Sequence, residues 1–363
     1  MSSLPESQST HDPKTDPPAP SASPEPTSAT RLIRLRAQLL SPASPLWIFL
    51  ALLVIVAVFS IMKPSSFLSS FDIKTIFVNA AVALTLSVGM TYVIITAGID
   101  LSVGSVLVMS GVVAAKTMIA VGGGAASAIN SGWGVILVGV AVGLLVGLGW
   151  GVINGALVAL LNIPPLIVTL GTFGMALGLA DVITGGTDIA GIPSKFNSTI
   201  GAGELGPVPW LVVIAGVVTI VFGLVLHYTR FGRYTYAIGS NGEAARRAGV
   251  NVKLHLIKVY AIAGVLSGLG GVLSLAYFDT TTISGHTTDN LTAISAVVIG
   301  GTSLFGGSGT MFGTVVGVFI PVVLAAGLVI VGVQSFWQQV MIGAILIVAV
   351  YFDQLRRRTR SKR

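Results

Sequence analysis

Residues 133–161 read WGVILVGVAVGLLVGLGWGVINGALVALL, a stretch without a single charged side chain. A helix needs about 20 apolar residues to cross the hydrocarbon core of a bilayer, and this stretch is longer than that. Its apolar residues lack the period-two alternation of a transmembrane barrel strand. Backbone polar groups in lipid must be satisfied within a helix or a closed barrel. The stretch therefore predicts a membrane-spanning helix.

The composition of the whole chain agrees with this prediction. Of its 363 residues, 53% are hydrophobic and only 9% are charged, and the mean hydropathy is +0.91. A soluble domain usually carries about 25% charged residues. There is no cysteine, which excludes disulfides and thiolate metal sites. The expected fold class is an all-α integral membrane protein, and we expect neither catalytic residues nor a metal site.

Ten apolar segments are candidates to span the membrane, and we predict a bundle of about ten (eight to ten) transmembrane helices. The segments are residues 46–62, 76–97, 101–121, 133–161, 165–184, 210–228, 256–277, 291–305, 309–331 and 336–352. The segment 291–305 is short and ends in glycines, and glycines also mark the boundary from Gly98 to Gly104. Either place could be a broken or re-entrant helix. Residues 46–353 together form the predicted transmembrane domain.

The basic residues predict the orientation of these spans. Sixteen of the 20 Lys and Arg fall into three clusters: Lys14, Arg31, Arg34 and Arg36; Arg230, Arg233, Arg246, Arg247, Lys253 and Lys258; and Arg356, Arg357, Arg358, Arg360, Lys362 and Arg363. Ten spans with a cytoplasmic start place all three clusters in the cytoplasm, which satisfies the positive-inside rule. Both termini and the loop 229–255 are therefore expected to be cytoplasmic. The net charge of +7 is a topology signal and does not indicate nucleic-acid binding.

Two tails flank the predicted membrane domain. Residues 1–30 hold seven of the 16 prolines and almost no large apolar side chains. Residues 1–45 are therefore expected to be a disordered cytoplasmic tail that ends in a basic segment next to the membrane. Residues 354–363 form a second, basic cytoplasmic tail. No apolar core follows a basic start at the N-terminus, so no cleaved signal peptide is expected.

Glycines recur at every fourth position of the segment 133–161. They are Gly139, Gly143, Gly147, Gly151 and Gly155. Small residues at this spacing let helix backbones approach closely. The period of four drifts by about 40° per step on a helix, so the stripe winds around it. One close contact is the simpler interpretation, and contact with several neighbours in a tightly packed bundle is the one that we favour.

A polar segment, Gly239–Gly249 (GSNGEAARRAG), interrupts the apolar sequence. Ser240 or Asn241 can cap a helix, Glu243 favours its N-terminus, and Gly249 can end it. The expected helix, from Gly242 to Ala248, has about two turns and would not persist alone in water.

This short helix is therefore expected to be ordered against another protein. Small alanines would fit a groove, and the arginines would pair with carboxylates of the partner. The candidate docking residues are Gly242, Glu243, Ala244, Ala245, Arg246, Arg247 and Gly249, and Ala248 adds a further small side chain. The alternative is a basic loop that touches anionic lipid.

Three polar residues are candidates for the transport path. Asp100 lies between two spans, where it either caps the next helix with help from Ser102 or bonds to a cargo. Capping is favoured, because a new helix should begin there. Asn154 and Thr169 offer neutral hydrogen-bonding groups that suit a polyol. For each of them a helix–helix hydrogen bond is the alternative.

The segment 239–249 resembles the EAA coupling loop of ABC-importer permeases. Three further stretches narrow the resemblance: TAGIDLSVG at 96–104; Asn154-Gly155 with Pro164-Pro165 and IVTLG at 167–171; and VIGGTSLFGG at 298–307. In this order and spacing they are similar to the monosaccharide (ribose-type) permease family, over residues 47–353. That family is related to branched-chain amino-acid permeases.

The resemblance implies a transport subunit of a bacterial plasma membrane that carries a monosaccharide, ribose-like in the first instance. It implies a second permease copy in a homodimer or paralogous heterodimer, and an extracytoplasmic sugar-binding protein. It also implies a cytoplasmic ABC ATPase that binds ATP and magnesium and docks on the helix 242–249. No lysine follows a glycine, so this chain has no GxxxxGK[ST] phosphate loop of its own.

Two alternative functions are an ABC permease for a branched-chain amino acid and an ATP-independent secondary transporter. A proton-coupled transporter is expected to hold several acids or histidines at mid-membrane. His227, His255 and His286 are predicted to lie near span ends or in loops, which argues against the second alternative.

Overall fold

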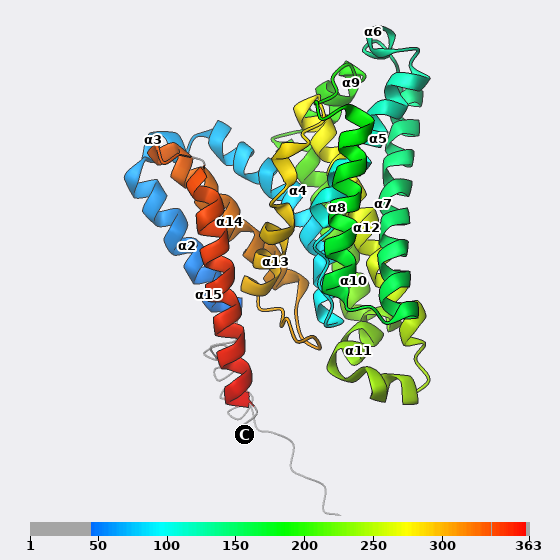
Figure 1. Cartoon of the computed structure of the whole chain (residues 1–363). Coiled ribbons are helices and arrows are strands. Elements are labelled where there is room, and N and C mark those ends of the chain that lie inside the picture. The colour runs from blue at the N-terminus through cyan, green and yellow to red at the C-terminus, as the bar shows by residue number, and fades with distance from the viewer. Residues whose placement is uncertain (1–44, 335, 361–363) are drawn as a thin grey trace, which may run out of the picture. The chain divides into compact units, whose positions relative to one another are not determined.

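The computed structural model describes residues 45–334 and 336–360, which are almost wholly helical (Figure 1). The predicted disordered tail, 1–45, lies outside the described residues except for Pro45, and so do residues 361–363 of the basic tail. The prediction of an all-α membrane protein is confirmed.

Within the described residues, seven helices are long and apolar enough to cross a membrane. They are α4 (Ser70–Ile95), α5 (Val103–Val121), α7 (Trp133–Leu161), α8 (Pro165–Thr184), α10 (Trp210–Tyr228), α12 (Val252–Phe278) and α14 (Met311–Val331). Two shorter apolar stretches, Trp47–Met62 and Phe336–Tyr351, belong to α2 (Pro45–Met62) and α15 (Phe336–Arg360). A count of ten is reached only if α2, α15 and the short α13 (Asp289–Ile299) are included.

The remaining elements connect these helices. They are α3 (Pro64–Phe67), α6 (Ala125–Ala128), α9 (Ser194–Phe196), the π-turn η1 (Asn197–Gly201), the antiparallel pair β1 (Glu204–Leu205) and β2 (Val208–Pro209), α11 (Arg230–Arg247) and the 3-10 turn η2 (Ser284–His286). Figure 1 shows α11 at one end of the bundle and α6 and α9 at the opposite end. The α11 end is the one predicted to face the cytoplasm.

Polar caps and prolines set several helix boundaries. The Ser69 hydroxyl accepts a hydrogen bond from the Asp72 N–H (3.0 Å), so α4 begins six residues before the predicted start of its apolar run. Pro164 and Pro165 separate α7 from α8, as the sequence predicted. At the other end of the chain α15 continues to Arg360, so the predicted basic tail 354–363 begins as helix.

Helix α4 is the centre of the bundle. Every residue from Leu84 to Ile95 is buried, and α4 packs against α10, α12, α13 and α14. A helix that is buried on all sides carries no polar face, and its packing rather than its amphipathicity fixes its position.

The glycine stripe of α7 faces two neighbouring helices. A side chain at Gly147 or Gly151 would overlap backbone atoms of Gly264 or Tyr260 in α12. Gly139 lies against Met118 and the Ala114 carbonyl of α5. The stripe therefore allows close approach to α12 over most of its length and to α5 at its start.

The predicted span 291–305 is corrected by the structure. The helix α13 has 11 residues, about 16 Å in length, which is too short to cross a bilayer alone. Gly300 follows its last turn and Gly301 adopts a positive φ of 89°, so the helix stops there. Residues 279–288, which precede it, contain only a 3-10 turn. This part of the chain is a broken helix.

Candidate functional site

The polar segment 242–249 forms the second part of α11. Helix α11 is kinked at Asn241, whose φ of −159° and ψ of 96° are not helical. The Asn241 side-chain carbonyl accepts a hydrogen bond from the Ala244 N–H (3.0 Å), and Gly249 has a positive φ of 84°. The cap and the stop expected from the sequence are both present, and they isolate a short helix.

One face of this short helix is open to solvent. Glu243, Ala244, Arg246, Arg247 and Ala248 are exposed, and Arg246 forms an ion pair with Glu243 (2.9 Å). That pair is more than half exposed on both sides, so it contributes little stability and its charges are free to pair elsewhere.

Ala245, in contrast, is only 5% exposed and faces into its own chain. The expectation that Ala245 fits a partner groove is therefore corrected. Ala244 and Ala248 remain as the small exposed side chains of the segment.

The first part of α11 is joined to the end of α4 through backbone contacts. Gly239 lies so close to the Ile95 carbonyl that a side chain would overlap it. The same carbonyl accepts a hydrogen bond from the Gly307 N–H (2.9 Å), and the Tyr236 hydroxyl donates to the Gly309 carbonyl (2.8 Å). Sequence reasoning missed Gly239 as a contact residue, although it is the first residue of the polar segment. Through Gly239 the polar segment contacts the end of α4 and the loop 300–310.

Asp100 and Asn154 meet through Ser102 in the turn that follows α4. One Asp100 carboxylate oxygen accepts hydrogen bonds from the Ser102 N–H (2.9 Å) and hydroxyl (2.6 Å). The Ser102 hydroxyl accepts from the Asn154 side-chain amide (2.8 Å). Burial raises the pKa of the Asp100 carboxyl, and the two hydrogen bonds from Ser102 oppose that shift.

Thr169 joins the same turn from α8. Its hydroxyl donates to the carbonyls of Ile99 (3.2 Å) and Pro165 (2.9 Å). Asp100, Asn154 and Thr169 are at most 2% exposed, so the three candidate path residues surround one buried turn. In this conformation they hold the turn at the start of α5 and do not face an open channel.

Two polar atoms at this turn have no hydrogen-bond partner among the described residues. They are the Asn154 side-chain carbonyl and the Tyr260 hydroxyl, which lies next to Gly98. Buried unpaired groups are costly, so a rearrangement or a bound water that pairs them is favoured. Sequence reasoning missed Tyr260, because a tyrosine in an apolar span carries no signal of its own.

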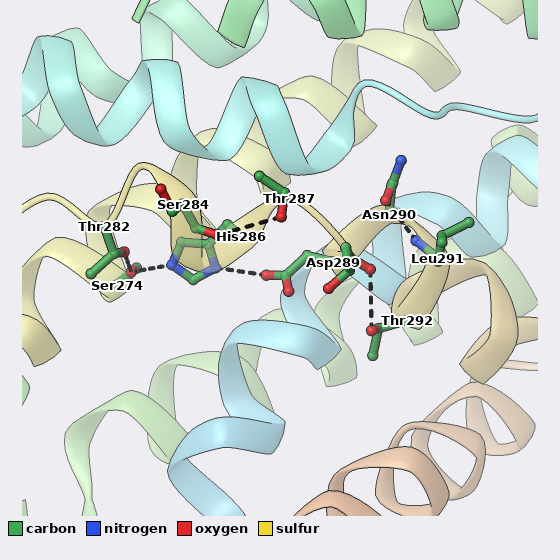
Figure 2. A network of polar contacts seen from close by, with 10 residues as sticks. Ser274, Thr282, Ser284, His286, Thr287, Asp289, Asn290, Leu291 and Thr292 are labelled. Atoms are coloured by element: carbon green, nitrogen blue, oxygen red, sulfur yellow. Dashed lines mark hydrogen bonds and ion pairs between the residues drawn. The ribbon is translucent and has the colours of Figure 1, made fainter. Parts of the chain in front are cut away.

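A second polar network surrounds His286 (Figure 2). Its Nδ1 lies 2.7 Å from an Asp289 carboxylate oxygen, and its Nε2 lies 2.7 Å from the Ser274 hydroxyl. His286 is buried, and its backbone carbonyl faces Gly104 at the start of α5. His286 lies in the non-helical segment between α12 and α13, as predicted, and this segment packs against the start of α5.

No group of three or more His, Cys, Asp or Glu side chains suited to a metal ion occurs in the part of the chain that the structure describes.

Comparisons with known proteins place the chain in a family. A family described as "Branched-chain amino acid transport system / permease component" matches residues 73–350. The D-allose transport system permease protein AlsC of Escherichia coli (strain K12) is 36% identical over 85% of this chain and 90% of its own length. The Ribose import permease protein RbsC of Bacillus subtilis (strain 168) is 36% identical over 84% of this chain and 91% of its own length.

The Galactose/methyl galactoside import permease protein MglC of Escherichia coli (strain K12) is 35% identical over 85% of this chain and 94% of its own length. No solved structure is significantly similar to the chain. Because the family match and the relatives cover most of an all-helical membrane domain, the chain belongs to the permease family of ABC importers, within the branch that contains sugar permeases.

Proposed function

We propose that this chain is the transmembrane subunit of an ATP-driven importer that moves a monosaccharide into the cytoplasm. Its sugar-permease relatives support the class of cargo. Allose, ribose and galactose all occur in their names, so a ribose-like sugar is one member of the proposed class. The family description names branched-chain amino acids, but these relatives do not favour that cargo.

The main support for a role in coupling ATP hydrolysis to transport is the contact between α11 and the end of α4. An exposed, capped helix with Glu243, Arg246 and Arg247 on its surface is continuous with Gly239, which touches the end of the central helix. We propose that a cytoplasmic ABC ATPase, which binds ATP and magnesium, docks on residues 242–249. Its closure would then shift the turn 96–102 and change the packing around Asp100.

We propose two further partners, one at the end of the bundle opposite α11 and one along the side of α8. With α11 in the cytoplasm, both termini are cytoplasmic, and the segment 185–209 at the opposite end would receive a sugar-binding protein. Gly171, Gly174 and Gly178 of α8 face open space, and such small residues suit close packing with a second permease copy.

The docking role is tested with the double variant Ala244→Glu/Arg246→Glu. Both side chains are exposed, so the chain should fold and insert normally, while repulsion should prevent docking. We expect loss of sugar uptake and of ATPase co-purification from membranes. Ala126→Glu, an exposed alanine at the opposite end, is the matched control and should retain the ATPase. Normal ATP-driven uptake by the double variant would contradict the docking role.

A further inference from the structure

The segment between α12 and α13 breaks the apolar pattern of the bundle. Nearly every residue from Thr280 to Asn290 is polar or glycine. Apart from the 3-10 turn η2, these residues are not helical before α13 begins at Asp289. Their backbone groups are therefore not satisfied by an internal helical ladder.

This segment lies inside the bundle and not beyond its end. The His286 carbonyl faces Gly104, and the Asn290 side-chain amide donates to the Leu101 carbonyl (3.0 Å). These two contacts lie at the start of α5, a helix of 19 residues and about 28 Å. The adjacent Ser102 bonds to Asn154, about 10 Å before the end of α7. The break therefore lies alongside α5, α7 and α12, within the length of these spans and not beyond their ends.

One side of the segment is held by the protein. The Ile283 N–H donates to the Asp188 carboxylate (2.9 Å), and the Thr281 N–H donates to the Ile189 carbonyl (3.1 Å). The other side is open: Ser284, Gly285 and Thr287 are exposed. Irregular backbone at membrane depth is tolerated only against protein or a water-filled cavity, so lipid cannot cover this side.

Asp289 gives this open side a specific chemistry. A carboxylate only accepts hydrogen bonds, so the His286 Nδ1 donates to Asp289, and Nε2 lies 2.7 Å from the Ser274 hydroxyl (Figure 2). This uses one carboxylate oxygen. The other has no hydrogen-bond partner among the described residues, and the side chain is 25% exposed. An ionisable residue inside the membrane is a functional candidate by default.

A second copy of the chain is less favoured than water or a neutral ligand as the contact of this exposed face. A two-fold axis that passes through this face would bring two Asp289 carboxylates together without a cation. Water and neutral hydroxyls carry no such penalty.

We propose that Ser284, Thr287 and Asp289 form the sugar-contacting face of the transport path, and that His286 is a positioning residue for Asp289. The free carboxylate oxygen and the hydroxyls would bond to ring hydroxyls of a neutral monosaccharide. This inference rests on the proposed function. Broken helices at membrane depth are common places for transporter binding sites, which agrees with the assignment.

The absence of cysteine makes the test direct, because each introduced thiol is the only one in the chain. Ser284→Cys and Thr287→Cys are reconstituted with the cognate ATPase and binding protein, and labelled with a charged methanethiosulfonate reagent. We expect both to react, and D-ribose, D-allose or D-galactose to slow the reaction at least fivefold. The sugar that protects should be one that the wild-type transporter carries.

Two control variants define the limits of the assay. Ser127→Cys, exposed in α6, should react without protection by sugar. Ile220→Cys, 64% exposed on the apolar helix α10, should not react. Failure of both test thiols to react while Cys at position 127 reacts would overturn the inference, as would reaction without protection by any transported sugar. A disulfide between two copies at position 284 would assign the face to the dimer instead.

The role of His286 is tested by kinetics. Asp289→Asn should raise the KM for sugar uptake about tenfold, because a charged acceptor is lost. His286→Asn should raise KM less, and the double variant should resemble Asp289→Asn, because the two act as one unit. Unchanged KM in Asp289→Asn would refute the contact. If the wild-type transporter, with its ATPase and binding protein, carries no monosaccharide, the proposed function fails instead.

Discussion

At the scale of single residues, the buried side chain of Asp100 should stabilise the fold through the hydrogen bonds that it accepts and not through its charge. Asp100→Asn keeps the oxygen that accepts from Ser102 and removes a charge that burial disfavours. Asp100→Leu leaves two donors of Ser102 unpaired, which costs about 2 kcal/mol or more. We expect the thermal unfolding midpoint in detergent to fall by several degrees for Leu and hardly at all for Asn. Equal midpoints for the two variants would contradict the role of Asp100 in holding the turn before α5.

The same scale shows where sequence reasoning succeeds and where it stops. Asn241 and Gly249 were identified correctly, because capping and helix termination depend on residues within a few positions. The burial of Ala245 was not foreseen, because it depends on contacts with other parts of the chain. His286 was correctly predicted to lie outside the spans, but its burial could not be read from the sequence.

At the scale of elements, the effect of a Gly→Ala change in α7 on stability should depend strongly on which glycine is replaced. Gly147→Ala would place a methyl group against backbone atoms of α12, whereas Gly149 of the same helix has nothing within 4 Å of such a group. Overpacking against backbone costs about 1–3 kcal/mol, and an exposed Gly→Ala change in a helix is neutral or stabilising. Differential scanning fluorimetry of the two purified variants should therefore show a lower midpoint for Gly147→Ala only. A loss of stability at Gly149 of the same size would contradict the packing assignment.

The presence of the long helices could largely be predicted from the sequence. Whether each apolar segment forms one unbroken helix could not. Of the ten predicted segments, seven correspond to helices long and apolar enough to cross a membrane in the part of the chain that the structure describes, because length and hydropathy decide whether a helix can span a bilayer. The end of α13 could be suspected from Gly300 and Gly301, but the position of Ser284 to Asp289 within the bundle could not. That position depends on contacts with α5 and α12, about which local sequence carries no information.

At the scale of the whole molecule, the structure joins two regions that are far apart in the sequence. The exposed helix 242–247 reaches the turn 96–102 through Gly239 and the end of α4. The turn holds Asp100 next to Asn154, and the same region of α5 supports the broken helix before α13. Under the proposed function, an ATPase docked on this helix would act on the polar groups inside the bundle through these contacts.

The central claim is that this chain moves sugar only when a separate ATPase acts on it. The most direct measurement is uptake of radiolabelled D-ribose, D-allose and D-galactose into proteoliposomes that contain this chain alone, or this chain with its cognate ATPase, binding protein and ATP. We predict accumulation of at least one sugar against its gradient in the complete system and no uptake by the chain alone. Comparable uptake by the chain alone, without ATPase or ATP, would contradict the account.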